Sequence, residues 1–288
     1  MRSQLSSDHI TTTTTMDLYH DFHAIKPTKL DYFDNMFTFQ SNSTLLSSFL
    51  DDDYRWALVL DSTIFHPQGG GQPCDVGIIS ATHSSSDSPG FKFVVQDVRL
   101  KDGIVFHYGF FEISEPINVE LGVPVSLTVD EPRRRLNSRL HSAGHLLDVC
   151  MRDVGLGHLE PGKAYHFPEG PYVEYKGSVP QDELQSKQKE LEKEANNLIS
   201  KGAIISVATL PYDEACKLCG GCLPDYISKE STPRIVRIGD YPGCPCGGTH
   251  VYDISEILSI TVSQLRTKKG LTKVFYNVGS WPASEAES

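Results

Sequence analysis

Short runs of apolar residues, or of alternating apolar and polar residues, fill the chain from residue 28 to residue 130. Trp56 to Leu60 and Phe91 to Leu100 are largely apolar, and the stretch from Val123 to Val129 alternates at a period of two. A period of two is typical of β-strands, whose successive side chains point to opposite faces. Several such runs separated by turn residues predict a small β-barrel or sandwich, and we expect the barrel.

The pattern becomes helical at Asp130. Asp130 suits the N-cap position of a helix, and Pro132 suits its first turn. The apolar residues that follow recur every three or four positions, as on one face of a helix. They are Leu136, Leu140, Ala143, Leu147 and Cys150. A second domain therefore begins near residue 131.

The rest of the chain mixes helical and strand patterns. Asp182 to Lys201 predicts a charged helix with a narrow apolar seam, and Ala164 to Gly177 predicts a strand with a polar, aromatic face. Further strands are expected at Ile204–Leu210, Arg234–Ile238, Ile257–Val262 and Thr272–Val278. Helices that alternate irregularly with mainly antiparallel strands indicate an α+β fold. We expect a tail over residues 1–27, a β-barrel domain over 28–130 and an α+β domain over 131–288.

The N-terminal tail lacks apolar periodicity and contains a run of five threonines, Thr11 to Thr15, so we expect it to be disordered. Met16 is an alternative start. The tail is poor in basic residues, which makes an organelle transit peptide a weak expectation without excluding it. No apolar run approaches the ~20 residues that cross a bilayer, and no hydrophobic secretory signal is present. We expect a cytoplasmic protein with no membrane partner.

Composition limits the class of protein. With 288 residues, 39% of them hydrophobic, the chain can bury the cores of one large or two ordinary domains. The net charge of -11 argues against a general nucleic-acid coat but does not exclude a local basic path. Two basic clusters are candidates for RNA contact: Arg133, Arg134, Arg135 and Arg139 in the predicted helix, and Arg266, Lys268, Lys269 and Lys273 near the C-terminus.

Two short motifs supply metal-ligand chemistry. His141 and His145 stand four residues apart in the predicted helix, so both imidazoles project from one face. Cys246 and His250 flank Gly247-Gly248 in a stretch that is expected to be a loop. Together the four side chains make a set of three nitrogens and one sulfur, which suits zinc.

The cysteines offer a competing site. Seven cysteines, an odd number gathered mostly between Cys216 and Cys246, fit ligand or free-thiol chemistry in a reducing compartment better than a disulfide framework. Cys216, Cys219 and Cys222 form a Cys-x2-Cys-x2-Cys run that could hold a second, structural zinc with Cys244. Such sites usually pair two Cys-x2-Cys knuckles, and the second knuckle is missing here. We therefore expect one zinc ion.

The motifs in combination resemble a known family. A helical His-x3-His, followed about a hundred residues later by Cys-Gly-Gly-Thr-His-Val at Cys246–Val251, resembles the editing domain of alanyl-tRNA synthetase, which threonyl-tRNA synthetase has in related form. Gly-Gly-Gly-Gln-Pro at residues 69–73 resembles the glycine motif of stand-alone alanyl-tRNA editing proteins. Pro171–Gly177 and Leu218-Cys-Gly-Gly fit the same family, and the resemblance covers residues 28 to 280.

The resemblance implies a deacylase that acts in trans on mischarged tRNA for alanine, removing a wrong amino acid, typically serine or glycine, at the acceptor end. No segment resembles the ATP-binding core of a synthetase. The resemblance also places the substrate beside the glycine motif, near Thr63, Gly69, Gly70 and Gln72. Ser142, Gly144 and His66 depart from the usual family pattern, which puts fine specificity in doubt rather than the metal site.

The chemistry can be examined without the family. A His-Glu-x-x-His peptidase needs a glutamate after its first histidine, and Ser142 stands there, so amide hydrolysis is poorly supported. An aminoacyl ester is more labile, and zinc could either activate water or position the substrate. A site that hydrogen-bonds the serine hydroxyl would reject alanine more strongly than an apolar pocket could. The basic clusters would meet tRNA through its phosphates.

Two other classes stay open on these residues. One is a non-catalytic, zinc-containing tRNA-binding module, and the other is a zinc hydrolase that acts on another aminoacyl ester. The amino acid removed, the preferred tRNA and the oligomeric state are left open by the sequence.

Overall fold

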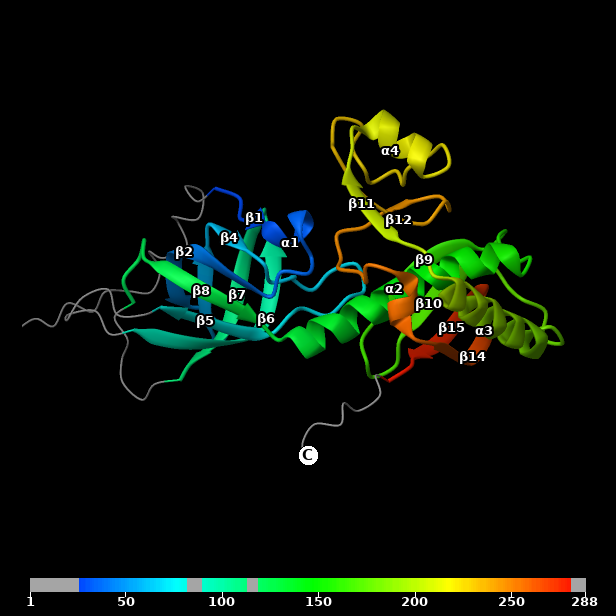
Figure 1. The fold of residues 1–288 in the computed structure, drawn as a ribbon, viewed down its shortest axis with the longest axis horizontal. Coiled ribbons are helices and arrows are strands. Elements are labelled where there is room, and N and C mark those ends of the chain that lie inside the picture. Colours follow the sequence, from blue (N-terminus) through cyan, green and yellow to red (C-terminus); the bar gives the residue numbers. More distant parts are fainter. Residues whose placement is uncertain (1–25, 82–89, 113–118, 281–288) are drawn as a thin grey trace, which may run out of the picture.

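A computed structural model describes residues 26–81, 90–112 and 119–280, so most of the predicted disordered tail lies outside the described residues. Figure 1 shows a barrel at one end, a long helix that leaves it, and a second part built around that helix. The predicted α+β class is confirmed, because antiparallel sheets and helices occupy separate regions. Among the helices in the described part of the chain, none is both long and apolar enough to span a bilayer.

Six antiparallel strands close the predicted barrel, in the order β2-β3-β7-β6-β5-β8. Their bounds are Gln40–Leu50 (β2), Trp56–Leu60 (β3), Gly77–Ala81 (β5), Phe91–Lys101 (β6), Ile104–Phe111 (β7) and Pro124–Val129 (β8). In β8 the period of two is strict, since exposed or half-exposed positions alternate with buried Val125, Leu127 and Val129. These side chains fill the interior with others such as Leu58 and Phe93. Closure leaves no open sheet edge in the barrel.

A short segment covers the side of the barrel that faces the second part. It contains β1 (Lys29–Leu30), which pairs in parallel with β4 (Ser62–Thr63), and the single-turn helix α1 (Asp31–Asp34). The loop after α1 carries Met36, which reaches the long helix described next.

The long helix α2 (Glu131–Asp153) begins where the sequence predicts. The Asp130 side chain accepts a hydrogen bond from the Arg133 backbone N–H at 3.0 Å, which caps the helix, and Pro132 lies in its first turn. The predicted apolar stripe packs into the core of the second part, with Leu140, Ala143, Leu147 and Cys150 buried. At 1.5 Å per residue the helix is about 35 Å long, enough to run from the barrel through the second part.

The core of the second part lies between a four-stranded antiparallel sheet and two helices. The strand order is β14-β15-β10-β9, and α2 and α3 (Leu184–Lys201) contact each other and this sheet. The strands are β9 (Glu160–Tyr165), β10 (Tyr172–Lys176), β14 (Ile260–Lys268) and β15 (Leu271–Val278). Alternate residues of β10 and β15, among them Val173, Tyr175 and Val274, are buried in this core.

Two strand predictions in this part were wrong in detail. The single strand expected over Ala164–Gly177 is a hairpin, because Pro168 to Gly170 turn the chain between β9 and β10. The strand expected from Ile257 begins at Ile260, because Ile254–Ile257 forms a 3-10 helix. Asp253 and Glu256 make a capping box on that turn, and the reciprocal bonds favour helix over strand there.

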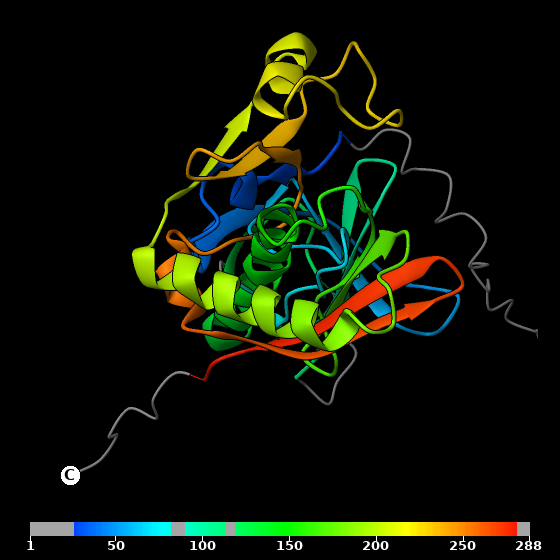
Figure 2. The same cartoon turned by 90° about the vertical axis from the view of Figure 1, so that its right-hand side faces the viewer.

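A small lobe completes the fold. It consists of the sheet β11-β12-β13, with bounds Ile205–Thr209, Arg234–Ile238 and Cys244–Pro245, and the helix α4 (Tyr212–Leu218). In both ribbon views α4 stands apart from the four-stranded sheet (Figures 1 and 2). Ala215, Leu223 and Ile235 form a core of its own. The lobe matters because its strand β13 leads directly into the Cys246 loop.

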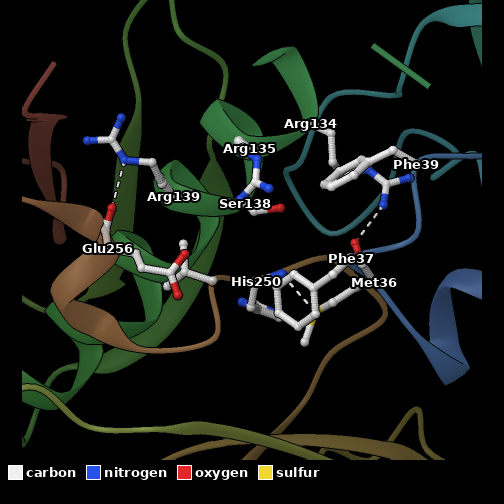
Figure 3. A pocket seen from close by; sticks show the side chains of 10 residues that line it. Met36, Phe37, Phe39, Arg134, Arg135, Ser138, Arg139, His250 and Glu256 are labelled. Carbon is white, nitrogen blue, oxygen red and sulfur yellow. Dashed lines mark hydrogen bonds between the residues drawn. The ribbon is translucent and has the colours of Figure 1, made fainter. Parts of the chain in front are cut away.

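A buried ion pair joins the barrel to α2. Arg134 and Asp75 are each 1% exposed, and the Arg134 Nε lies 2.8 Å from both carboxylate oxygens. The same guanidinium donates to the backbone oxygens of Met36 and Ile64, at 3.1 and 2.6 Å. Figure 3 shows the Arg134 side chain directed toward Met36. All three contacts come from the barrel side, so Arg134 anchors the helix there.

We expect Arg134→Met to lower the free energy of unfolding by about 3–5 kcal/mol, because Asp75 would remain buried without its counter-charge. Urea denaturation of the full chain measures this loss. Arg133→Met, at an exposed position one residue earlier, is the matched control and should change stability by less than about 0.5 kcal/mol. A loss below about 1 kcal/mol for Arg134→Met would contradict the anchoring role.

Candidate metal centre and its cleft

Four ligand side chains converge where α2 passes the lobe. His141 and His145 project from one face of α2, with ring centroids 4.9 Å apart, and Cys246 and His250 come from the loop after β13. One ligand atom from each of the four residues lies within 4.8 Å of the others. The cluster that the spacing predicted therefore exists, and it could hold a metal ion.

Glycine permits the loop to approach the helix this closely. A Cβ atom added to Gly248 would lie 2.2 Å from His141 Cε1 and 2.7 Å from Gln72 Oε1, which no side chain allows. The Cys-Gly-Gly-Thr-His spacing thus places Cys246 and His250 on either side of a backbone that touches the His141 ring.

The amide of Gln72 orients His141. Its Oε1 accepts a hydrogen bond from the Thr249 backbone N–H at 2.9 Å, which fixes the orientation of the amide because an N–H can only donate. The same oxygen lies 2.7 Å from His141 Nδ1, so that nitrogen must carry the proton. His141 Nε2 is then left with a lone pair, 3.5 Å from Cys246 Sγ. A partner on the other ring nitrogen is the usual arrangement for a metal-ligating histidine.

The two remaining imidazoles also present Nε2 to the cluster. His250 Nε2 lies 3.4 Å from Cys246 Sγ, while its Nδ1 lies 3.4 Å from the Ser142 hydroxyl. His145 Nδ1 lies 3.3 Å from Cys244 Sγ, and its Nε2 is buried with no hydrogen-bond partner in the described part of the chain. A buried nitrogen without a partner is costly, and a bound ion would satisfy it. The donor set therefore fits a metal.

The electrostatics agree with this fit. Burial lowers the pKa of His145 to about 4 and lowers the pKa values of His141 and His250 well below the usual value, so all three rings are neutral donors. Burial raises the pKa of the Cys246 thiol, and the Arg234 guanidinium opposes that shift by stabilising the thiolate. Arg234 also donates to the backbone oxygens of Cys246 and Gly248, at 2.7 and 2.9 Å, which holds the loop in place.

Three of the four ligand residues, His141, His145 and Cys246, line a cleft of about 870 Å³. Phe33 of α1 and Gly70 and Gly71 of the barrel contribute to its lining, together with residues of α2, the β9–β10 hairpin and the lobe. Gly70 and Gly71 have positive φ angles of 56° and 81° and form a two-residue turn closed by Gly69 and Gln72. A Cβ on Gly71 would lie 2.5 Å from the Ala164 carbonyl oxygen, so glycine lets the barrel touch the second part at the cleft.

The other residues of the glycine-motif prediction have internal partners. The Thr63 hydroxyl is buried and lies 2.8 Å from His107 Nε2, and Thr63 does not line the cleft. Both polar ends of the Gln72 amide are engaged, since its Nε2 donates to Thr249 Oγ1 at 2.9 Å. Gln72 therefore acts on the cluster through His141, and its predicted contact with substrate stays a prediction.

The first basic cluster divides in two. Arg133 and Arg135 are exposed, whereas Arg134 and Arg139 are buried. The Arg139 Nε donates to the Glu256 backbone oxygen at 3.0 Å, a bond drawn in Figure 3. Arginines in the first turns of an amphipathic helix usually face solvent. Here partners from the barrel side enclose Arg134, and backbone oxygens of the second part enclose Arg139. Arg266, Lys268 and Lys269 are exposed on β14 and its turn, and Lys273 is half-buried on β15.

The competing cysteine site receives no support. Cys216 lies on α4, Cys219 follows it directly, and Cys222 is exposed. In the described residues, these thiols belong to no group of ligand side chains close enough together to hold one ion.

No family model matches the chain. It is 31% identical over 227 residues to the alanyl-tRNA editing protein AlaX-L of Pyrococcus horikoshii, which covers 78% of this chain and 52% of that protein. The chain is a relative of the alanyl-tRNA editing proteins. It is also 29% identical to an alanine–tRNA ligase of Neisseria meningitidis and 29% identical to that of Methanosarcina acetivorans, over 72% and 77% of the chain but only 22% and 23% of the ligases. The predicted resemblance is thereby confirmed, and the chain spans about half the length of the editing protein.

Two polar residues of the cleft in this editing-protein relative were not predicted. Asp148 follows His141 by seven positions on α2, only about 20° away around the helix axis, so the spacing could have revealed it. Burial raises the pKa of Asp148 to about 6. The Tyr175 hydroxyl, which donates to Asp148 at 2.7 Å, opposes this rise because it stabilises the carboxylate. His166 lies just after β9, and no local pattern marks it. Its ring stacks on His141 with centroids 4.7 Å apart.

We expect Gln72→Ala to weaken zinc affinity roughly 10- to 100-fold, because His141 would lose the partner that holds its ring and tautomer. Competition titration with a chromophoric chelator measures the affinity, and Cys246→Ala should abolish stoichiometric binding. Gln68→Ala, at an exposed position of the same loop, is the matched control. Equal affinities for the Gln72 and Gln68 variants would contradict the orienting role.

Proposed function

We propose that this chain hydrolyses the ester between a wrong amino acid, serine or glycine, and tRNA for alanine. The observation that carries the proposal is the four-ligand cluster at the wall of an open cleft, in a chain related to an alanyl-tRNA editing protein over 78% of its length. A cleft of about 870 Å³ can admit an aminoacyl group with the ribose that bears it. The barrel supplies the glycine turn to that cleft and Gln72 to the cluster, so we propose residues 28–130 and 131–288 as two cooperating domains.

Zinc is the ion that we propose for the cluster, with His141, His145, Cys246 and His250 as its ligands. Three neutral imidazoles and one thiolate match its preference for nitrogen and sulfur donors. When bound, it would polarise the ester carbonyl as a Lewis acid and lower the pKa of water.

Asp148 is the general base that we propose. Its carboxylate accepts a proton from the attacking water, the water oxygen bonds to the ester carbonyl carbon, and the bond to the ribose oxygen breaks. The ribose oxygen takes up that proton, so the products are a free amino acid and tRNA with an intact terminal hydroxyl. A carboxylate with a pKa of about 6 is ionised at neutral pH and still basic enough to act, which is what general-base catalysis requires.

Exposed or half-buried cations of α2 and of the β14–β15 hairpin are the proposed tRNA contacts. Arg133 and Arg135 on α2, and Arg266, Lys268, Lys269 and Lys273 on the β14–β15 hairpin, would bind phosphates. Arg134 and Arg139 are excluded from this proposal because they are buried against internal partners. Two of the hairpin cations lie over aromatic rings. Arg266 Cζ is 5.5 Å from the centroid of Phe275, and Lys273 Nζ is 3.8 Å from the centroid of Tyr172, a residue that also lines the cleft. Aromatic rings next to cations suit unpaired nucleotides.

Hydrolysis of seryl-, glycyl- and alanyl-tRNA(Ala) by the zinc-loaded chain tests the function. We expect loss of serine or glycine, with alanine spared, and we expect the Cys246→Ala, His250→Ala double variant to be inactive although folded. Cys222→Ser, which changes an exposed thiol, should retain full activity. Binding of tRNA without hydrolysis of any of the three esters would favour the non-catalytic module, and hydrolysis of small aminoacyl esters alone would favour another hydrolase.

Asp148→Asn should lower kcat about 10²- to 10⁴-fold while zinc content stays unchanged. Because only the ionised carboxylate can accept the proton, wild-type activity should rise with pH and level off above a midpoint near 6. A bound dication would shift that midpoint lower. Asp153→Asn, at an exposed acid of the same helix, is the control. An unchanged pH profile in Asp148→Asn would overturn the assignment.

A further inference from the structure

His166 is held beside the cluster by contacts with the barrel and with α2. Its backbone N–H donates to the Gly71 carbonyl oxygen at 2.8 Å, which ties it to the glycine turn of the barrel. Its ring packs over Gly144 of α2, where an added Cβ would lie 2.3 Å from His166 Cε1. The same ring stacks on His141 and lines the cleft. His166 is not one of the four residues whose ligand atoms all lie within 4.8 Å of one another, so we look for a role other than metal ligation.

The tautomer of His166 follows from its neighbours. The Tyr276 hydroxyl lies 2.9 Å from the Leu140 carbonyl oxygen, which can only accept, so the single hydroxyl proton points there. His166 Nδ1 lies 2.6 Å from the same hydroxyl and must therefore donate to it. Its Nε2 is left as an acceptor, and no described residue donates to it. The residue is 3% exposed and lines the cleft.

We propose that His166 Nε2 accepts a hydrogen bond from the side-chain hydroxyl of the serine to be removed. This inference rests on the proposed deacylase function and makes His166 a specificity residue. Selection of serine over alanine requires an acceptor that would stay unpaired opposite a methyl group. The Thr63 hydroxyl and the Gln72 amide are already bonded inside the protein, and the cluster nitrogens are reserved for the ion. Of the polar groups described above, His166 Nε2 meets the requirement.

The alternative role for the same nitrogen is as a base toward water, and the two roles differ in what they predict. A base acts on every ester, whereas an acceptor for the side-chain hydroxyl acts on serine and has nothing to bind in glycine. The ratio of kcat/KM for serine to that for glycine therefore separates them.

The test compares seryl- and glycyl-tRNA(Ala) as substrates of His166→Phe and His166→Gln in the zinc-loaded full chain. Phenylalanine keeps a ring against Gly144 and His141 but removes the acceptor, so the serine-to-glycine ratio should fall roughly 10- to 100-fold. Glutamine places an oxygen near the position of Nε2, so the ratio should recover in large part. Zinc content and thermal unfolding verify that both variants are intact.

Gly144→Ala is a second route to the same result, because its Cβ would push the unaltered His166 ring aside and should also lower the ratio. An equal loss on both substrates, or no loss, would overturn the inference while leaving the deacylase function standing. A wild-type chain that cleaves neither ester would instead overturn the proposed function, so the two failures are distinguishable.

Discussion

The amide of Gln72 is the contact on which the centre depends, because it joins three segments that are distant in the chain. It comes from the barrel, holds the helix residue His141 at 2.7 Å, and binds the backbone and side chain of Thr249 in the loop that carries Cys246 and His250. The helix supplies one ligand pair, the loop supplies the other, and Gln72 of the barrel holds both segments. The cluster therefore forms only when barrel, helix and loop are docked together. The buried pair of Arg134 and Asp75 supplies that docking near the start of the helix.

Small residues make the docking close enough for chemistry. Gly248 lets the loop backbone meet the His141 ring, Gly144 makes room for His166, and Gly71 brings the barrel against β9. Each glycine leaves a space that a neighbouring ring or carbonyl fills, so the rings lie in contact with backbone rather than with flexible side chains. Contacts of this kind restrict ring orientation, which a metal centre and a selective pocket both need.

Burial also determines the charge of the site. Three imidazoles and a thiol share a desolvated region in which the rings stay neutral and the thiol retains its proton, with Arg234 as the neighbouring cation. A bound dication would stabilise such a region, because it would convert the thiol into a thiolate ligand. The polar groups then divide by role, because Gln72 and Ser142 face the outer nitrogens of the ligands, while Asp148 and His166 line the space that substrate would enter.

Features that follow from local geometry could be predicted from the sequence. Apolar and alternating runs located three of the six barrel strands, β3, β6 and β8, and the helical period located α2. The spacings within His141–His145 and Cys246–His250 identified the two halves of the cluster. Which polar groups meet across the chain depends on tertiary contacts. Arg134 and Arg139 read as surface charges until partners from other segments enclosed them, and Gln72 became an orienting residue through contacts 69 and 177 residues away. The spacing from His141 places Asp148 on the ligand face of α2, but the burial of Asp148 and the position of His166 depend on long-range contacts, which leave no periodic pattern in a sequence.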